Sequence, residues 1–206
     1  LASSKIDNDK KTIISTIESH RDRLIEISDN IWEAAEPALL EFKSSKYLSD
    51  YAEENGFRVT LGVADIPTAF VAEYGSGKPI IGILGEFDAN PGISQKKQPT
   101  KEPLVKGAAG HGCGHNLFGT ASLGAAIAIK EMIESGEISG TVRFYGTPAE
   151  ETIFAKVWMV RAGLFDDLDV CMDWHPGDEI EASTQSSKAL VDFRLKFYGD
   201  AAHASG

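Results

Sequence analysis

A glycine-rich stretch, GHGCGHNLFG at residues 110–119, carries the side chains best suited to bind a metal ion. Cys113 and His115 lie two residues apart in it, between glycines and directly before an apolar, helix-forming run. A thiolate and an imidazole at this spacing can reach one metal ion or two neighbouring ions, because the glycines let the backbone curl until both side chains converge. The same pair also occurs where it only packs in a turn, so this stretch alone leaves metal binding and a structural role both open.

Further metal-competent side chains share one position, just past the C-terminal end of a predicted buried strand: Asp88 after 79–84, Glu150 and Glu151 after 141–146, and His175 after 169–174. In open parallel α/β sheets, this edge is where binding crevices form. The loop of Cys113 and His115 leads into a helix that can cap the same edge. Several such groups on one rim are much less expected by chance than a single pair, so the sequence predicts a metal centre.

Each of these side chains also has a structural interpretation. Adjacent glutamates are usually a solvated surface, but Pro148 ends the strand before Glu150 and lets both carboxylates face one cleft. His175 can be a hydrogen-bonded core histidine, and Asp88 in FDANPG can brace a turn.

Cys171, His20 and His111 are not expected to bind a metal ion. Cys171 lies in an apolar run and is expected in the core, and His20 in the first predicted helix is expected on the surface. His111 either supports Cys113 from two residues away or is an exposed loop histidine.

The elements that must position these residues alternate along the chain. Helical periodicity or composition predicts helices over 9–35, 41–55, 116–134 and 154–163, and short apolar runs predict strands over 57–61, 68–74, 79–84, 141–146 and 169–174. The Gly-, Pro- and Lys-rich stretch 90–107 is expected to be a loop. This rhythm predicts an α/β fold, with a largely parallel twisted sheet covered by helices on both faces.

Composition limits the class of protein and its partners. The 206 residues are 42% hydrophobic and 25% charged, which is typical of a globular chain with a sizeable core. A net charge of −11 argues against nucleic acid or an anionic membrane surface as partner, since both select basic patches. No apolar run approaches the ~18–20 residues of a membrane span. The two cysteines are expected to be free thiols, which favours a reducing, cytoplasmic location.

The mixture of ligand types narrows the chemistry. Thiolate, imidazole and carboxylate together suit zinc, manganese or cobalt rather than calcium or magnesium. Paired glutamates suggest that one coordinates the metal while its neighbour acts as general base towards a water whose pKa the metal lowers to ~7. The base can then return the proton to a leaving amine. This set of groups suits hydrolysis of an amide bond.

Five segments, in this order and spacing, carry a family resemblance: GHGCGHNL, TPAEE, WMVRAGLFDDLD, DWHP and AAHASG. They resemble the di-metal metallopeptidases and amidohydrolases of clan MH, which include glutamate carboxypeptidase, aminoacylase, hippurate hydrolase and auxin-conjugate hydrolases. The GCGHN form and the MVRAGLFDD stretch are most similar to the aminobenzoyl-glutamate hydrolase branch. The resemblance covers about residue 15 to 206. It implies the N-terminal part of a zinc-peptidase-like catalytic domain in 1–184 and the beginning of a smaller α+β lid and dimerisation domain in 185–206.

The same resemblance implies a role for each matching residue. Cys113 would bridge two divalent ions, zinc or manganese, in the place where other branches use an aspartate. His115 and His175 would ligate one ion and Glu151 the other. Glu150 would be the general base.

Three positions depart from the pattern or extend it. Asp88 matches an acidic residue that follows a metal-binding histidine by two positions in other branches, and here Glu86 stands where that histidine would be. We do not expect Glu86 to be a ligand, because His115 would supply the imidazole. Asn116 replaces the aspartate of the hippurate-hydrolase branch, which bears on the substrate. His203 would reach from the lid into the partner subunit's active site of a homodimer and stabilise the oxyanion.

Family members continue well beyond the point where this sequence stops, and a further metal-ligating histidine lies in that part. The resemblance therefore implies the N-terminal part of a longer enzyme, from a trimmed, proteolysed or truncated chain, with little activity on its own. LASSKIDNDKK at its start lacks an initiator Met and a signal segment, so it is expected to be processed or trimmed.

The predicted activity is metal-dependent cleavage of the amide bond of a small N-acyl amino acid or dipeptide-like substrate, such as aminobenzoyl-glutamate. The alternative is an inactive metal-binding or partner-binding paralogue, against which the intact Glu150-Glu151 pair argues. Deamination or phosphoester cleavage on a similar sheet is the other alternative. Two-metal phosphoester sites favour oxygen ligands, so Cys113 argues against phosphoester cleavage.

Overall fold

The computed structural model describes residues 2–182 and, after them, only the single positions 189, 191, 193, 195, 196 and 198. The chain divides into two compact units, residues 1–176 and 177–206. All the helices and strands named below belong to the first unit. His203 lies outside the described residues, as does most of the expected lid segment 185–206.

The order of elements follows the predicted alternation. The helices are α1 (Ala2–Ser19), α2 (Arg21–Ala34), α3 (Phe42–Glu54), α4 (His115–Glu134), α5 (Glu150–Ile153) and α6 (Ala155–Arg161), with one 3₁₀ turn at Val63–Asp65. The strands are β1 (Arg58–Leu61), β2 (Phe70–Ser76), β3 (Ile80–Gly85), β4 (Gly140–Gly146) and β5 (Val170–Met172). No helix within the described range is long and apolar enough to cross a membrane.

Within the part of the chain that the structure describes, the strands form one five-stranded sheet in the order β1-β2-β4-β3-β5. β3 runs parallel to β4 and β5, while β2 is antiparallel to both β1 and β4. Four strands therefore point the same way and β2 alone is reversed, because β1 and β2 are paired as neighbours along the chain. In the register of β3 and β4, Leu84 pairs with Tyr145 and Gly85 with Gly146, so the two strands end level. The loops that follow them therefore leave the same edge of the sheet.

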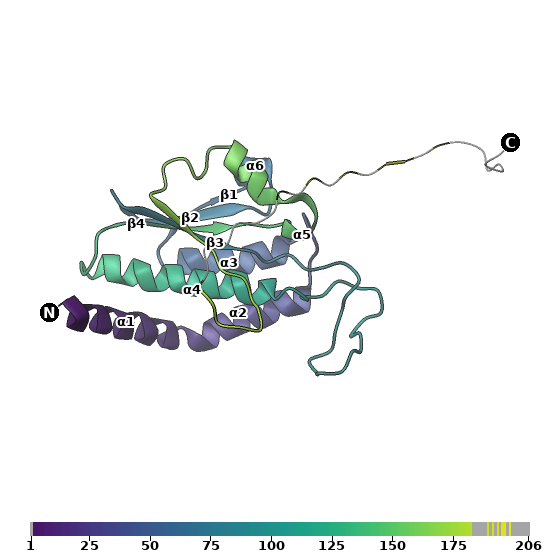
Figure 1. Ribbon diagram of the computed structural model, residues 1–206, viewed down its shortest axis with the longest axis horizontal. Helices are drawn as coiled ribbons and strands as arrows, with labels where there is room; N and C mark the ends of the chain where they lie inside the picture. The colour runs from purple at the N-terminus through teal and green to yellow at the C-terminus, as the bar shows by residue number, and fades with distance from the viewer. Residues whose placement is uncertain are drawn as a thin grey trace. The chain divides into compact units, whose positions relative to one another are not determined.

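Helices cover both faces of this sheet, as the sequence predicts (Figure 1). Helices α3 and α4 contact the sheet on one face, and α1 and α2 pack on their outer side. Side chains alternate between the faces along each strand. In β4, Phe144 belongs to the core beneath α3 and α4, whereas Tyr145 belongs to a smaller core on the opposite face with Ala155 and Met159 of α6.

Helix α4 lies unusually close to β3 because glycines face each other where they meet. A Cβ built on Gly119 would lie 2.6 Å from the carbonyl oxygen of Glu86 and 3.2 Å from Leu48 Cδ1. A Cβ on Gly85 would lie 3.1 Å from Gly119 Cα. This close approach places the N-terminus of α4 beside the residues that follow β3.

The expectations for the burial of His20 and Cys171 are wrong. The helix predicted over 9–35 is two helices that part at His20, whose side chain is only 20% exposed. Its ring nitrogens contact Tyr51 Oη at 2.5 Å and Glu131 Oε1 at 3.1 Å, so polar partners on α3 and α4 draw it inward. Cys171 is exposed rather than in the core, because β5 is a three-residue strand at the edge of the sheet that the described residues form, where it pairs with β3.

Candidate metal centre

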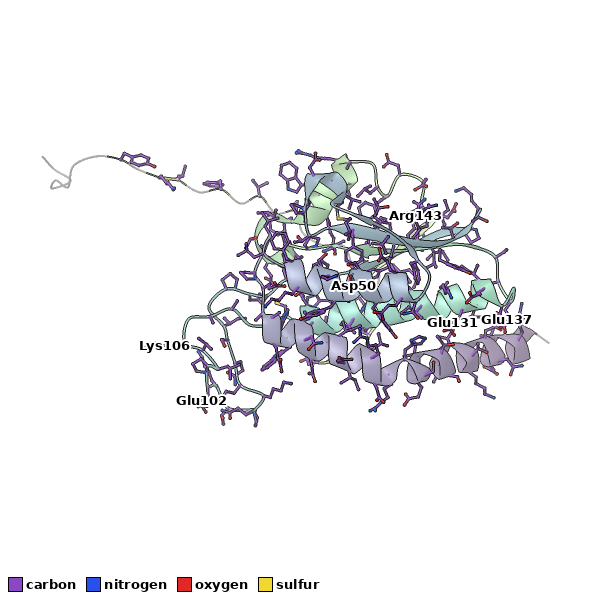
Figure 2. All side chains as sticks on the ribbon, turned by 180° about the vertical axis from the view of Figure 1, so that it is seen from behind. Asp50, Glu102, Lys106, Glu131, Glu137 and Arg143 are labelled. Carbon is purple, nitrogen blue, oxygen red and sulfur yellow. The ribbon has the colours of Figure 1, made fainter. Side chains whose placement is uncertain are left out.

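The predicted ligands gather where β3, β4 and the N-terminus of α4 meet. The long connection between β3 and α4 projects from this end of the first unit (Figure 1). Glu102 and Lys106 mark that connection in Figure 2, and Glu131 and Glu137 mark the opposite end of α4.

His115, the first residue of α4, is the centre of the cluster and is only 1% exposed. Its Nδ1 lies 3.0 Å from Asp88 Oδ1 and 3.1 Å from the Asp88 carbonyl oxygen. Both oxygens can only accept, so Nδ1 carries the hydrogen and donates it. Nε2 faces Glu86 Oε2 at 2.9 Å and Glu151 Oε1 at 3.7 Å, so it is the ring nitrogen that could bind a metal ion once its proton is displaced. A carboxylate that orients a histidine through its other nitrogen is a common arrangement at metal sites.

Asp88 connects this histidine to the loop that follows β4. Its side chain is fully buried, and Oδ2 accepts a hydrogen bond from the backbone N–H of Glu151 at 3.0 Å. Burial alone would raise the pKa of Asp88, but hydrogen bonds from His115 and from the backbone of Glu151 and Glu150 lower it. Asp88 is therefore held as a carboxylate between the two segments.

Cys113 is positioned by Asn90, a residue to which the sequence analysis gave no role. Asn90 Oδ1 accepts from the backbone N–H groups of Gly112 and Cys113, both at 3.2 Å, and its Nδ2 donates to Cys113 Sγ at 3.5 Å. Gly114 has a φ of 72°, which lets the chain turn into α4 directly afterwards. Asn90 lies in the FDANPG stretch, whose sequence is typical of a turn, and nothing local in that sequence links Asn90 to Cys113.

Two groups of potential ligand atoms result, and they share His115. In the first, one atom each of Cys113, His115 and Glu151 lies within 4.8 Å of the others. In the second, the same holds for Glu86, His115 and His175. The structure therefore brings together the four predicted metal ligands, and it adds Glu86, which the sequence analysis did not expect to be a ligand.

Apart from His115, the two members of the second group, Glu86 and His175, each follow the end of a strand. His175 follows β5 and is exposed, with its ring centroid 5.6 Å from that of His115. Its Nδ1 lies 2.9 Å from the Pro176 carbonyl oxygen, which accepts its hydrogen and leaves Nε2 as the lone-pair nitrogen. Glu86 forms an ion pair with Lys156 of α6 through Oε1, while Oε2 faces His115. Lys156 could not be recognised from sequence, because a lone lysine on a short helix carries no signal.

Charge is concentrated at this site. Burial would lower the pKa of His115, but the hydrogen bond to Asp88, the 2.9 Å contact with Glu86 and the negative charges of both carboxylates raise it to about 10. A hydrogen bond with Glu151, together with burial, raises the pKa of the Cys113 thiol. The carboxylates thus hold protons on both residues, and a divalent cation would displace those protons on binding.

Buried polar atoms that lack well-formed hydrogen bonds also indicate a metal ion at this cluster. Glu86 Oε2, His115 Nε2 and Glu151 Oε1 are buried, and the described part of the chain offers them no hydrogen bond of standard geometry, although Glu86 Oε2 and His115 Nε2 lie 2.9 Å apart. Such atoms are rare in folded proteins and call for a physical explanation. Here they converge, and their donor types together with the Cys113 sulfur match zinc, manganese or cobalt. The residues present therefore fit a metal centre of this class.

The remaining candidates lie around this cluster. Glu150 begins α5 beside Glu151, outside both groups of ligand atoms, and burial and the charge of Glu86 raise its pKa. His111 contacts the end of α2, where its Nε2 donates to the carbonyl oxygen of Ile31 at 3.0 Å. Burial lowers the pKa of His111 to about 4, so it stays neutral and anchors the glycine-rich loop.

Comparison with known proteins identifies relatives of this chain. The model of peptidase family M20/M25/M40 matches residues 82–199. One p-aminobenzoyl-glutamate hydrolase subunit from Escherichia coli (strain K12) is 46% identical over 198 residues, covering 94% of this chain and 40% of the relative. A second subunit of the same name, from the same organism, is 31% identical over 150 residues, covering 66% of this chain and 34% of the relative.

A solved structure shows the same fold. The dinuclear metal-binding peptidase of the M20 family from Bacillus subtilis superposes with a TM-score of 0.64 at 26% identity, over 75% of this chain and 42% of that one. The chain thus spans less than half the length of these relatives. The family predicted from the sequence motifs is confirmed: the chain belongs to peptidase family M20/M25/M40.

Proposed function

We propose that the chain provides the metal centre of an amidohydrolase that cleaves small N-acyl amino acids or dipeptide-like substrates, among them aminobenzoyl-glutamate. The observation that carries the proposal is the convergence of Cys113, His115 and Glu151 within 4.8 Å, with Glu150 next to Glu151 on α5. The substrate class follows the name of the relative that is 46% identical, a p-aminobenzoyl-glutamate hydrolase subunit.

Two divalent ions, zinc or manganese, would be held by these residues. Cys113 would be a ligand of both ions, His115 and His175 would be ligands of one, and Glu151 would be a ligand of the other. Glu86 is an additional candidate ligand through Oε2, the oxygen that its ion pair with Lys156 leaves unpaired.

Bound divalent ions act as Lewis acids that polarise the scissile carbonyl and make water more acidic. The general base is Glu150, which accepts a proton from the attacking water and returns it to the leaving amine. Its raised pKa favours the first half of this exchange, since a base of higher pKa takes up a proton more readily. Asp88 keeps the Nδ1 hydrogen of His115 in place, so that Nε2 stays directed at the ligand cluster.

The lid, the partner subunit and the cellular compartment extend this proposal. His203, in a lid that begins at about residue 185, stabilises the oxyanion in the partner subunit of a homodimer. The two free cysteines favour a reducing compartment, so we place the protein in the cytoplasm.

The test of the metal centre compares two cysteine variants. After reconstitution with Zn²⁺ or Mn²⁺, elemental analysis should find one or two ions per wild-type chain and a loss of at least one ion in Cys113→Ala. Cys171→Ala is the matched control, because it removes a free thiol at the sheet edge, and it should keep the wild-type content. Equal metal content in the two variants, or none in the wild type, contradicts the proposal.

The test of the reaction uses Glu150→Gln and the release of p-aminobenzoate from aminobenzoyl-glutamate. The variant should keep its metal content but lose hydrolysis by about 100-fold or more, as expected for removal of a general base. Both the 206-residue chain and the natural protein that contains it are assayed. Hydrolysis by Glu150→Gln at the wild-type rate would show that Glu150 is not the base.

A further inference from the structure

Glu41 is a buried carboxylate for which the reaction proposed above has no use. It stands at the end of the segment between α2 and α3, and it has no exposed surface. Its Oε1 accepts a hydrogen bond from the backbone N–H of Ala149 at 2.9 Å, and its Oε2 accepts one from the Thr68 hydroxyl at 3.1 Å. A carboxylate is costly to bury, so a site that keeps one with these partners has a specific use for it.

The partner that matters is Ala149, the residue directly before Glu150 and Glu151. Ala149 is fully buried and has left-handed backbone angles, φ 54° and ψ 37°. This conformation costs a non-glycine residue about 1–2 kcal/mol, so the surroundings must hold it in place. The hydrogen bond from Glu41 engages the N–H of this residue, at the point where the chain turns from β4 into α5.

The segment that carries Glu41 is also attached to the other acidic loop of the site. The carbonyl oxygen of Glu36 accepts from the backbone N–H of Ala89 at 2.9 Å, and Pro37 pairs with Ala89 in an isolated parallel bridge. Ala89 directly follows Asp88. One short segment is thus bonded to the residue after Asp88 and to the residue before Glu150.

We propose that Glu41 is a positioning residue for the metal centre. Its carboxylate fixes the backbone of Ala149, and so sets where Glu150 and Glu151 stand relative to His115. This inference rests on the proposed function, which gives Glu150 and Glu151 their roles. Glu41 itself touches neither metal nor substrate, and its contribution is to hold one loop against another.

The decisive comparison is between Glu41→Gln and Glu41→Met. Glutamine has nearly the volume of glutamate, and methionine is larger by about one methylene group. Only glutamine can still accept from the Ala149 N–H, while its NH₂ turns to the Thr68 oxygen. Methionine leaves the Ala149 N–H buried without an acceptor. Zn²⁺ titration by calorimetry should give Glu41→Gln an affinity within about twofold of wild type. Glu41→Met should bind Zn²⁺ at least about tenfold more weakly, the lower range for loss of a group that supports ligands.

Thr68→Val is the matched control for a purely structural role. It removes the other hydrogen bond of the same buried carboxylate and leaves the Ala149 bond in place. It should lower the melting temperature without changing Zn²⁺ affinity. Zn²⁺ affinity that is unchanged in Glu41→Met, or weakened equally in Thr68→Val, overturns the inference.

Hydrogen exchange of the Ala149 amide, measured by NMR on the metal-free chain, separates this inference from the proposed function. Protection of that amide should persist in Glu41→Gln and fall at least tenfold in Glu41→Met, whether or not the wild type binds metal. Should Glu41→Met not fold, Glu41→Gln decides: loss of Ala149 protection and of Zn²⁺ affinity in this variant refutes the inference, and retention of both supports it. Failure of the wild type to bind Zn²⁺ counts against the proposed function alone.

Discussion

At the scale of single residues, the burial of Glu41 makes the stability of the fold depend on pH. Burial raises the pKa of its carboxyl from 4.5 to about 7, although hydrogen bonds from the backbone of Glu41 itself, from Ala149 and from Thr68 act in the opposite direction. The negative charge of Asp88 adds to the rise. A carboxyl group that holds its proton more tightly when folded contributes stability that is complete below about pH 4.5 and is lost as the pH rises through 7.

Glu41→Gln removes this dependence, because glutamine does not titrate. The free energy of unfolding of the variant should therefore increase relative to wild type between pH 5 and pH 8, by up to about 3 kcal/mol at 1.4 kcal/mol per pKa unit. Urea denaturation of both metal-free chains at unit steps of pH measures the difference. Glu137→Gln, on an exposed surface glutamate, should show a difference that stays level with pH. If the difference in free energy of unfolding between Glu41→Gln and wild type also did not change with pH, this would contradict the raised pKa of Glu41.

Which residues of the site could be predicted from sequence depends on where their partners lie. Cys113 and His115 are two positions apart, and Glu151 and His175 closely follow strands, so motif and strand position suffice to propose them as ligands. Asn90 and Glu41 are identified only by contacts across the fold, and the hydrogen bond to Glu41 comes from Ala149, 108 residues away. No local pattern in a single sequence records such a partner.

At the scale of elements, the distance between α4 and β3 decides whether the ligands can meet. His115 begins α4, and the residues that it contacts follow β3. The contact of Gly119 with the Glu86 backbone leaves no room for a side chain between the helix and the end of the strand. The closeness of this packing is therefore a condition for the cluster around His115.

Gly119→Ala should separate α4 from β3 and weaken both the fold and the site. Its Cβ would meet a backbone oxygen at 2.6 Å, which cannot move aside, so we expect a cost of about 1–3 kcal/mol and a clear loss of Zn²⁺ affinity. Gly124→Ala on the same helix is the control, because its Cβ would meet only the flexible end of Leu24 at 3.0 Å. Alanine also favours the helix by about 1 kcal/mol over glycine, so this control should be near neutral. Urea denaturation and calorimetry measure both quantities, and equal behaviour of the two variants would refute the argument.

The elements themselves were largely predictable, and the exceptions have physical causes. Apolar runs and helical periodicity placed every strand, and the helices α3 and α4, to within a few residues, because burial of apolar side chains imposes these patterns. The first helix begins seven residues before its predicted start. The same periodicity continues through His20 and conceals the break between α1 and α2. The apolar run around Cys171 predicted burial, but an edge position leaves part of a strand uncovered.

At the scale of the whole molecule, the two edges of the sheet differ in chemistry. Among the described residues, β5 ends one side of the sheet and exposes Val170 at 49% and Met172 at 57%. β1 ends the other side, where the exposed residues include Arg58 and Thr60. An apolar strand edge invites pairing with another chain, whereas charged side chains discourage it.

We therefore expect the isolated chain to associate weakly through β5. Light scattering during size-exclusion chromatography should show a mass that rises with concentration, and Met172→Lys should reduce this rise. Leu61→Lys places the same charge on the β1 edge, at a leucine that is 61% exposed, and should have little effect. A mass that does not depend on concentration, or equal effects of the two lysines, would show that the chains do not associate through β5.

The ligand cluster draws on four stretches of chain, at 86, 113–115, 151 and 175, which only the assembled sheet brings together. An ion held in this way is bound by the tertiary structure and not by any one segment. A synthetic peptide of residues 110–119 would lose most of the affinity, since it would have to order two side chains without help from the others. In a denaturant titration the ion should leave in the same cooperative step in which β3 and β4 separate. Metal release would then report the folding of the entire first unit.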